Sequence, residues 1–350
     1  MFMQSLHRAR TVSAHARTIL KAGSMKAGSR KAGLLAAFGL ATALAAPAAL
    51  AEYPDRPIQL VLSFPPAGAT DVLARAVGQR LSQVLQQPVV VENRPGAGGA
   101  IGMSFAAKAA PDGYTLYLAA VSNAAIAAAT YSSQPANLAT DFVPVAAIGN
   151  VPHILVVPAS LPVQNVSQLV QYLKAAPGKY NFASQGAGTL SHLESELFRL
   201  RTGVDVLHVP YKGSAFALPD LMAGRAAMMF DSIPAALPHV KSGKLRLLAV
   251  ASEKRVSSLP EAKTMGEEGV ADFKVNNLFG LVAPKGTPPA VVRKLEGAMK
   301  TVLAMPELVQ SLEAQGVQVD FRPAEPFGRM IADEMRQWSK VAQAARVKID

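Results

Sequence analysis

Residues 57–71 read PIQLVLSFPPAGATD, and this stretch decides the class of fold. The apolar first part predicts a strand over residues 57–63. Small residues and prolines follow over residues 64–71, and a helix is predicted over residues 71–87, where apolar side chains recur four residues apart: Leu73, Val77, Leu81 and Leu85. Strand, small-residue loop and helix in this order form the repeating unit of α/β proteins with mostly parallel sheets.

The same alternation continues to the end of the chain. Further strands are predicted at residues 88–92, 114–119, 154–157, 180–183, 204–209, 226–230, 245–251 and 278–282. Further helices are predicted near residues 100–110, 166–176, 189–202, 215–223, 288–304, 306–315 and 325–345. The sequence therefore predicts an α/β fold throughout.

A second series of alternating strands and helices begins at His153, and after Val275 the chain returns to the first series. This arrangement predicts two lobes, the second inserted into the first. The first lobe is discontinuous and comprises residues 52–152 and 276–350, and the second lobe comprises residues 153–275. Two chain crossings, near residues 150–154 and 273–278, would then form the hinge.

Residues 1–51 have the features of a cleaved export signal. They contain seven basic residues and no acidic residue, and an apolar run extends from Ala32 to Leu44. That run is shorter than the roughly 20 residues of a membrane-spanning helix. Ala49-Leu50-Ala51 forms a small-x-small cleavage motif before Glu52. Met25, which a lysine follows, would open an ordinary basic region by itself, so we expect translation to start there.

Removal of this segment changes the electrostatic interpretation. The chain has 35 basic and 24 acidic side chains, and subtracting the seven basic residues of the segment leaves 28 against 24, a net charge near +4. No dense stripe of Lys and Arg with interleaved aromatic residues remains, so nucleic-acid binding is not expected. The chain has no cysteine, which excludes disulfides, thiolate catalysis, zinc–sulfur sites and a lipid anchor at the cleavage site.

Two loops of small residues, one in each predicted lobe, are the main candidates for ligand binding. Each loop, residues 64–71 and residues 184–189, connects a strand to the start of a helix. A helix N-terminus offers unpaired backbone N–H groups and the positive end of the helix dipole, so it favours an anion. The binding residues expected there are Phe64, Pro66, Ala67, Gly68, Ala69, Thr70 and Asp71 in the first lobe, and Ser184, Gly186, Gly188, Thr189 and His192 in the second.

One such loop alone is equally well interpreted as a tight turn, but matched loops in both lobes favour binding. If they face each other, they could hold both ends of a dicarboxylate, or one carboxylate and a distal polar group. Ser191 and Glu194 also have the spacing of a capping box at the start of the second helix.

Other polar residues follow strand ends, where ligands bind in open α/β sheets. Ser122 and Asn123 follow the third strand, and Tyr211 and Lys212 follow a strand of the second lobe. Lys212 is equally well interpreted as a solvated loop charge. Asp231 could order a ligand-bridging water or cap the next helix.

Competing motifs are weaker. Gly96, Gly98 and Gly102 imitate a dinucleotide-binding fingerprint, but the spacing differs and the next strand lacks the expected acid, so a structural turn is the better interpretation. His192 and Glu196 are four residues apart, as two metal ligands would be, but no third ligand is in view. We therefore expect neither a cofactor nor a metal.

Catalysis is not expected either. Ser184 is not in a Gly-x-Ser-x-Gly elbow. None of the histidines after residue 51 has the context of a general base with an orienting acid: His153, His192, His208 and His239.

Several separated motifs resemble, in one order, the solute-binding proteins of the tripartite tricarboxylate transporter system, the Bug (Bordetella uptake gene) family. They are YPDRPI at 53–58, FPPAGATD at 64–71, VENRPGAGG at 91–99, PDGYTL at 111–116, VPYKG at 209–213, SGK at 242–244, GLVAP at 280–284 and GTP at 286–288. The resemblance covers essentially the whole chain after residue 51.

This resemblance implies a type II periplasmic-binding-protein fold, two α/β lobes joined by a two-crossing hinge, with no cofactor. It also implies that a small carboxylate lies between residues 64–71 and residues 184–189. This sequence departs from the family pattern at two places near the expected site: Ser122-Asn123-Ala124 stands where many members have a histidine, and Ala67-Gly68-Ala69 replaces a Gly-Gly pair.

The function expected is hinge-bending (venus-flytrap) capture of a small carboxylate in the periplasm for a tripartite transporter. Its partners would be the large and small membrane subunits, and the receptor is expected to be a monomer. Two alternatives stay open: a ligand-sensing subunit for a membrane sensor kinase, and a secreted enzyme on the same fold.

The cleavage site is directly testable. We expect the exported protein to begin at Glu52, because Ala49-Leu50-Ala51 provides the small side chains that the processing enzyme requires. N-terminal sequencing of periplasmic protein measures this, and retention of residues 25–51 in that fraction would contradict it.

Overall fold

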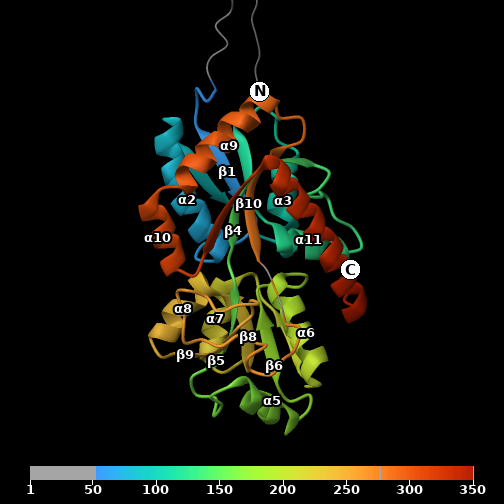
Figure 1. Ribbon diagram of the computed structural model, residues 1–350. Helices are drawn as coiled ribbons and strands as arrows, with labels where there is room; N and C mark the ends of the chain where they lie inside the picture. Colours follow the sequence, from blue (N-terminus) through green and yellow to red (C-terminus); the bar gives the residue numbers. More distant parts are fainter. Residues whose placement is uncertain (1–52, 274, 276, 350) are drawn as a thin grey trace, which may run out of the picture. The chain divides into compact units, whose positions relative to one another are not determined.

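The structure, a computed structural model, describes residues 53–273, 275 and 277–349 (Figure 1). The predicted signal segment, its cleavage before Glu52 and the start at Met25 lie outside the described residues. In the described part, two β-sheets are each packed between helices, so the protein consists of two α/β lobes.

The sheet of the first lobe has six strands in the order β11-β4-β10-β3-β1-β2. They are β1 (Ile58–Leu62), β2 (Val89–Asn93), β3 (Thr115–Ala120), β4 (Phe142–Asn150), β10 (Leu278–Pro284) and β11 (Gln318–Pro323). β1 is parallel to β2 and β3, whereas β10 is antiparallel to β3 and β4.

Alternation along β1 sorts the side chains between the two faces of this sheet. Ile58, Leu60 and Leu62 join one core and Val61 joins the other. The helices over the first face are α2 (Ala69–Leu85), α9 (Pro289–Leu303) and α10 (Pro306–Ala314), and those over the second are α3 (Ala100–Ala107) and the first half of α11 (Ala324–Ala345).

The sheet of the second lobe has five strands in the order β7-β6-β8-β5-β9. They are β5 (His153–Pro158), β6 (Asn181–Ser184), β7 (Leu207–Pro210), β8 (Met228–Ser232) and β9 (Leu245–Val250). α5 (Val166–Lys174) and α6 (Leu190–Thr202) cover one face, and α7 (Ser214–Met222) and α8 (Ile233–Lys241) cover the other.

Two chain segments pass between the lobes. The first connects Asn150 at the end of β4 to His153 at the start of β5. The second returns before β10, and the two are hydrogen-bonded, because Val151 N donates to Asn277 O at 2.9 Å. The crossings therefore lie side by side, as a two-strand hinge requires.

The C-terminal helix α11 contributes to the cores of both lobes. Its Phe327 and Ile331 pack under the six-stranded sheet, while Trp338 lies in the core of the second lobe with Leu155 and Phe182. Ile126 of α4 (Val121–Thr130) joins that second core as well. The predicted residue boundaries of the lobes stay a prediction, but the packing unit of the second lobe includes α4 and the end of α11.

Besides the short 3₁₀ helix η1 (Ala97–Gly99), four elements of the described residues escaped sequence analysis: α4, β4, α8 and β11. The α4 segment is rich in alanine and buried on most sides, so it has no amphipathic period. Pro144 in β4 and Pro238 in α8 are residues that argue against a strand and a helix, respectively. Among the described residues, no helix combines the length and apolar character needed to cross a membrane.

Trp338 tests how much α11 contributes to stability. Trp338→Ala should lower the free energy of unfolding by about 3–5 kcal/mol, since it empties a large buried site in the second lobe's core. Lys340→Ala, on the exposed side of the same helix, should change it by no more than about 0.5 kcal/mol. Urea denaturation followed by circular dichroism measures both, and equal effects would show that Trp338 packing is not stabilising.

Candidate functional site

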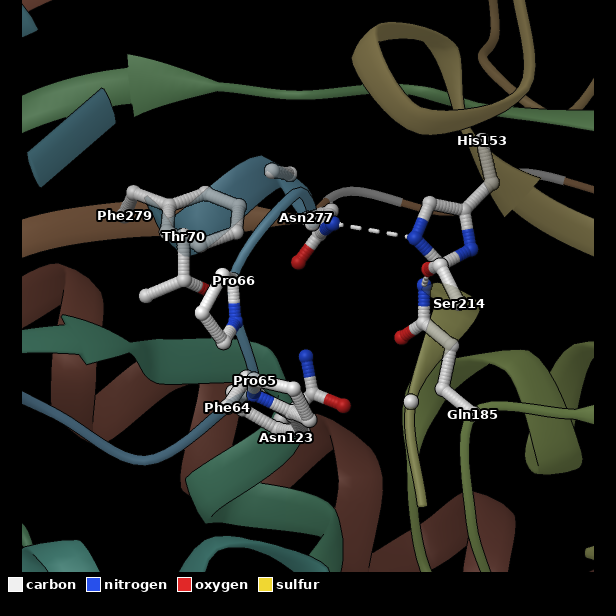
Figure 2. Close-up of a pocket in the computed structure, with 13 residues that line it drawn as sticks. Phe64, Pro65, Pro66, Thr70, Asn123, His153, Gln185, Ser214, Asn277 and Phe279 are labelled. Atoms are coloured by element: carbon white, nitrogen blue, oxygen red, sulfur yellow. Dashed lines mark hydrogen bonds between the residues drawn. The ribbon is translucent and has the colours of Figure 1, made fainter. Parts of the chain in front are cut away.

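A cavity lies between the lobes, and Figure 2 shows the 13 residues that line it. From the first lobe and the second crossing they are Phe64, Pro65, Pro66, Gly68, Ala69, Thr70, Asn123, Asn277 and Phe279, and from the second lobe His153, Gln185, Gly213 and Ser214. Below, this cavity is called the cleft. Six predicted binding residues are among its lining: Phe64, Pro66, Gly68, Ala69, Thr70 and Asn123.

The first-lobe wall of the cleft is the N-terminus of α2. Gly68 is the N-cap, and no side chain caps the first turn. The amides of Ala69 and Thr70 therefore lack partners from the helix or from a cap, and both residues line the cleft. This end of α2 has the geometry of an anion site, as the sequence suggested.

Asp71 braces this loop instead of facing a ligand. Its carboxylate accepts hydrogen bonds from Ala67 N at 3.1 Å and Asn93 Nδ2 at 3.0 Å, and it pairs with Arg75 at 2.9 Å. Burial raises the pKa of Asp71, but these hydrogen bonds and the Arg75 charge outweigh burial and hold the pKa below its ordinary value. Asp71 and Ala67, both predicted to bind, do not line the cleft.

The second-lobe wall is the N-terminus of α7, with Gly213 as N-cap and Ser214 as the first helical residue. Gly213 has φ 115°. A Cβ there would lie 3.0 Å from Cδ of Pro65, which belongs to the other lobe. Glycine is needed both for the backbone conformation and for this close approach of the two lobes.

The predicted second anion loop, residues 184–189, is not the wall of the cleft. Its helix, α6, has its first amide occupied, because Leu190 N donates to Asn123 Oδ1 at 2.9 Å. The Gly188 amide donates to His192 Nδ1 at 3.3 Å, and the Thr189 amide donates to Gly186 O. Of this loop only Gln185 lines the cleft; four predicted binding residues do not, namely Ser184, Gly186, Gly188 and Thr189.

His192, also predicted to bind, packs against the 184–189 loop within the second lobe. Its ring stacks on that of His208 with centroids 3.8 Å apart, and His208 Nε2 lies 2.6 Å from Ser184 Oγ. Burial, with a smaller effect from His192, lowers the pKa of His208 to about 3. Burial also lowers the pKa of His192, so both rings are neutral packing groups at physiological pH. Within the described residues no three His, Asp or Glu side chains gather as metal ligands would.

Three further predicted residues point elsewhere. The Tyr211 hydroxyl donates to Asp220 at 2.8 Å, and Lys212 is exposed outside the cleft lining. Ser122 is buried and donates to Glu334 on α11 at 2.7 Å. Of the 209–213 motif, Gly213 lines the cleft, whereas Tyr211 and Lys212, the two residues predicted from the sequence, do not.

Asp231 lies directly behind the lining. Its Oδ1 accepts hydrogen bonds from Gln185 Nε2 at 2.6 Å, Ser214 Oγ at 2.8 Å and Ser232 N at 2.7 Å. Asp231 therefore positions two residues that face the cleft. The N-cap of α8 is Ser232, so Asp231 does not cap that helix.

The floor of the cleft includes a residue set that sequence analysis missed. His153 Nδ1 lies 2.5 Å from Glu194 Oε2. Figure 2 shows the contact on the other side of the ring, where Asn277 Nδ2 lies 3.1 Å from His153 Nε2. The predicted capping box was wrong, since Glu194 pairs with His153 and Ser191 Oγ donates to Phe230 O. No local spacing signals this set, because its members come from β5, α6 and the second crossing.

Comparison with known proteins places the chain in a family. Residues 73–347 match the family model described as tripartite tricarboxylate transporter family receptor. The chain belongs to this receptor family. It is 40% identical over 320 residues to Protein BugT of Bordetella pertussis, covering 90% of this chain and 98% of that protein.

Solved structures agree with this membership. The R. palustris protein Rpa4515, solved with adipate, is 36% identical with a TM-score of 0.82 over 85% of this chain and 99% of that one. MatC from Rhodopseudomonas palustris, solved with bound malate, is 30% identical with a TM-score of 0.77 over 83% of this chain and 99% of that one. These matches confirm the predicted family and the periplasmic-binding-protein fold.

Two glycine variants distinguish a residue of the cleft, Gly68, from a residue of the 184–189 loop, Gly188. At Gly68 an added Cβ meets only Pro65 O, at 3.9 Å, and φ is −90°, so Gly68→Val should fold with a loss of no more than about 2 kcal/mol. At Gly188 φ is +68° and a Cβ would lie 2.6 Å from Tyr131, so Gly188→Val should unfold far more easily.

Thermal unfolding compares the stability of the two variants, and calorimetric titration with a carboxylate that the wild-type protein binds measures the effect on binding. Binding of that carboxylate should be lost in Gly68→Val, because the branched side chain covers the α2 amides. Normal binding by a folded Gly68→Val protein would mean that these amides do not contact the anion.

Proposed function

We propose that the protein is a periplasmic solute receptor that captures a small carboxylate in the cleft and does not turn it over. The observation that carries this proposal is the pair of helix N-termini, those of α2 and α7, that line opposite walls of one cavity. Backbone N–H groups and the positive ends of two helix dipoles suit an anion held between them.

The charge of the lining supports a carboxylate held mainly by backbone groups. Among the described lining residues there is no Lys or Arg. Thr70 and Asn123 provide uncharged side-chain donors, whereas Gln185 and Ser214 already donate to Asp231. Hydrogen bonds to an ionised carboxylate are about twice as strong as neutral ones, so these groups suffice without a salt bridge. The carboxylates bound to the two relatives from Rhodopseudomonas palustris, adipate and malate, support this class of ligand.

Capture would proceed by separation and closure of the lobes. The cavity measures about 20 Å³, which is room for about one water molecule, so entry of a carboxylate requires the walls to move apart. The two hydrogen-bonded crossings would form the hinge between residues 52–152 with 276–350 and residues 153–275. Contacts from both walls then stabilise the closed form when a ligand is bound.

Catalysis has no support in the geometry of the cleft. Ser214 Oγ donates to Asp231, and His153 is paired with Glu194 and Asn277. A hydroxyl nucleophile and its general base would have to contact each other, and these two do not.

The partners in this proposal are the large and small membrane subunits of a tripartite transporter, which would recognise the closed receptor. The receptor acts as a monomer in the periplasm after residues 1–51 are removed. Family membership supports transport over delivery of ligand to a sensor kinase.

Thr70→Ala and Lys212→Ala test how the carboxylate is held. Thr70→Ala should weaken binding of adipate or malate by about 1.5–3 kcal/mol, the value of a hydrogen bond to a charged group, because Thr70 lines the cleft. Lys212→Ala should leave binding unchanged, since Lys212 lies outside the lining.

Isothermal titration of the exported protein with each acid measures this, and mass spectrometry of ligand retained through native purification identifies the physiological acid. A large loss of affinity in Lys212→Ala with no loss in Thr70→Ala would contradict the proposal that the starts of α2 and α7 hold the carboxylate. Turnover of a bound carboxylate would favour an enzyme instead.

A further inference from the structure

Beneath the cleft lies a group of three buried titratable side chains that the capture of an anion by helix N-termini does not use. His153 is the one titratable residue among the described lining residues. Its side chain is 1% exposed and that of its partner Glu194 is 0% exposed. Asp231 on β8 is also fully buried. Burial of an unpaired carboxylate is energetically unfavourable. The presence of two buried carboxyl groups near one imidazole therefore suggests a functional role for this group.

Asn277 connects this buried group to the cleft. Its Nδ2 lies 3.1 Å from His153 Nε2, and within the described residues its Oδ1 is buried without a hydrogen-bond partner. Figure 2 shows the amide nitrogen turned to His153 and the oxygen on the opposite side of the amide. In this arrangement Nε2 accepts from Asn277, so the imidazole is neutral and its Nδ1–H donates to Glu194.

One added proton reverses the donor and acceptor roles. If the added proton is on the imidazole, both ring nitrogens carry a hydrogen. If it is on Glu194, the carboxyl group donates to Nδ1 and the ring hydrogen is on Nε2. In both cases His153 Nε2 carries a hydrogen. An Nε2–H cannot face an NH₂ group. The Asn277 amide must turn over, so that Oδ1 accepts from His153 and the NH₂ group takes the place of the oxygen.

The two orientations have opposite effects on an arriving carboxylate. A carbonyl oxygen next to the ligand repels it, whereas an NH₂ group donates a hydrogen bond to it. We propose that Asn277 is a carboxylate-binding residue whose NH₂ group is turned to the ligand by protonation of the His153–Glu194 pair, so that carboxylate binding takes up a proton. This inference rests on the proposed function and specifies how that same site recognises its ligand.

The surrounding charges favour this coupling. The titratable groups that face His153 are Glu194 on α6 and Asp231 on β8, both acidic. Burial lowers the pKa of His153, but the charge and hydrogen bond of Glu194 and the charge of Asp231 outweigh burial and raise the pKa above its ordinary value. Burial raises the pKa of Asp231, and the charge of His153 opposes this effect, so the protonation of Asp231 is coupled to that of the His153–Glu194 pair.

The sign of the pH dependence follows from this linkage. The protonated form binds better, so the pKa of the His153–Glu194 pair is higher with ligand bound than without. Affinity is then constant below the pKa of the free protein, falls as pH rises through it, by up to about tenfold per pH unit, and levels off above the pKa of the complex.

Calorimetry with adipate tests the proposal directly. Above about pH 7 both adipate carboxyl groups are ionised, so they do not titrate in the experiment. Titrations at one pH in buffers that differ in ionisation enthalpy give the number of protons taken up. We expect a value that rises from near zero toward about one per adipate as pH increases through the pKa of the free protein.

Three variants distinguish a positioning role from a purely structural one. Glu194→Gln removes the charge that attracts the proton, so the fall in affinity should move to lower pH. Asp231→Asn, which does not contact His153, should move it in the same direction by less. Asn277→Leu removes the donor, so it should weaken binding at low pH and flatten the profile. His239→Gln, on α8 and outside the lining, is the matched control and should keep the wild-type profile.

The outcomes separate this inference from the function on which it rests. Binding of adipate without proton uptake, with an unshifted profile in folded Glu194→Gln and Asp231→Asn proteins, overturns the inference and leaves the receptor function intact. Failure of adipate, malate and a wider panel of carboxylates to bind at any pH overturns the proposed function itself.

Discussion

The backbone amides at the start of an α-helix have no partners within the helix, and in this protein two such starts meet at one cavity. The α2 amides are left without a side-chain cap, and Gly213 at the start of α7 allows Pro65 of the other lobe to approach within van der Waals contact. Groups left open in this way must be satisfied by water or by an anion. The anionic class of ligand proposed above follows from this requirement.

The side chains around these amides hold the backbone in place more than they contact a ligand. Asp71 is neutralised by Arg75 and fixes the 64–71 loop, while Asp231 orients Gln185 and Ser214. The stacked rings of His192 and His208 support the 184–189 loop from within the second lobe. Rigid support of this kind keeps donors aimed at the ligand before it arrives, which reduces the entropy lost on binding.

The lobes are joined by more than the two crossings, because α11 contributes to both cores. Trp338 packs in the core of the second lobe, and its Nε1 donates to Glu334, which also accepts from Ser122 in the first turn of α4. The helix therefore connects the two cores in addition to the crossings.

The sequence by itself determined the class of fold and most of its elements, because apolar periodicity and glycine-rich loops are local signals. It also determined the first wall of the cleft, since residues 64–71 carry a strand end, a loop and a helix start in one continuous stretch. Family resemblance extended this to the type of binding protein. The elements that it missed, such as α4 and β4, are those in which burial on several sides or a proline removes the local pattern.

Only the tertiary structure decided the second wall and the floor. Both α6 and α7 begin after loops that contain glycine, and their sequences do not show which of them faces the other lobe. Asn123 occupies the first amide of α6, and Pro65 packs against the start of α7. The contact between His153, Glu194 and Asn277 joins residues from three separate elements. Such a contact depends on how strands and crossings are placed in space, and no spacing along the chain encodes it.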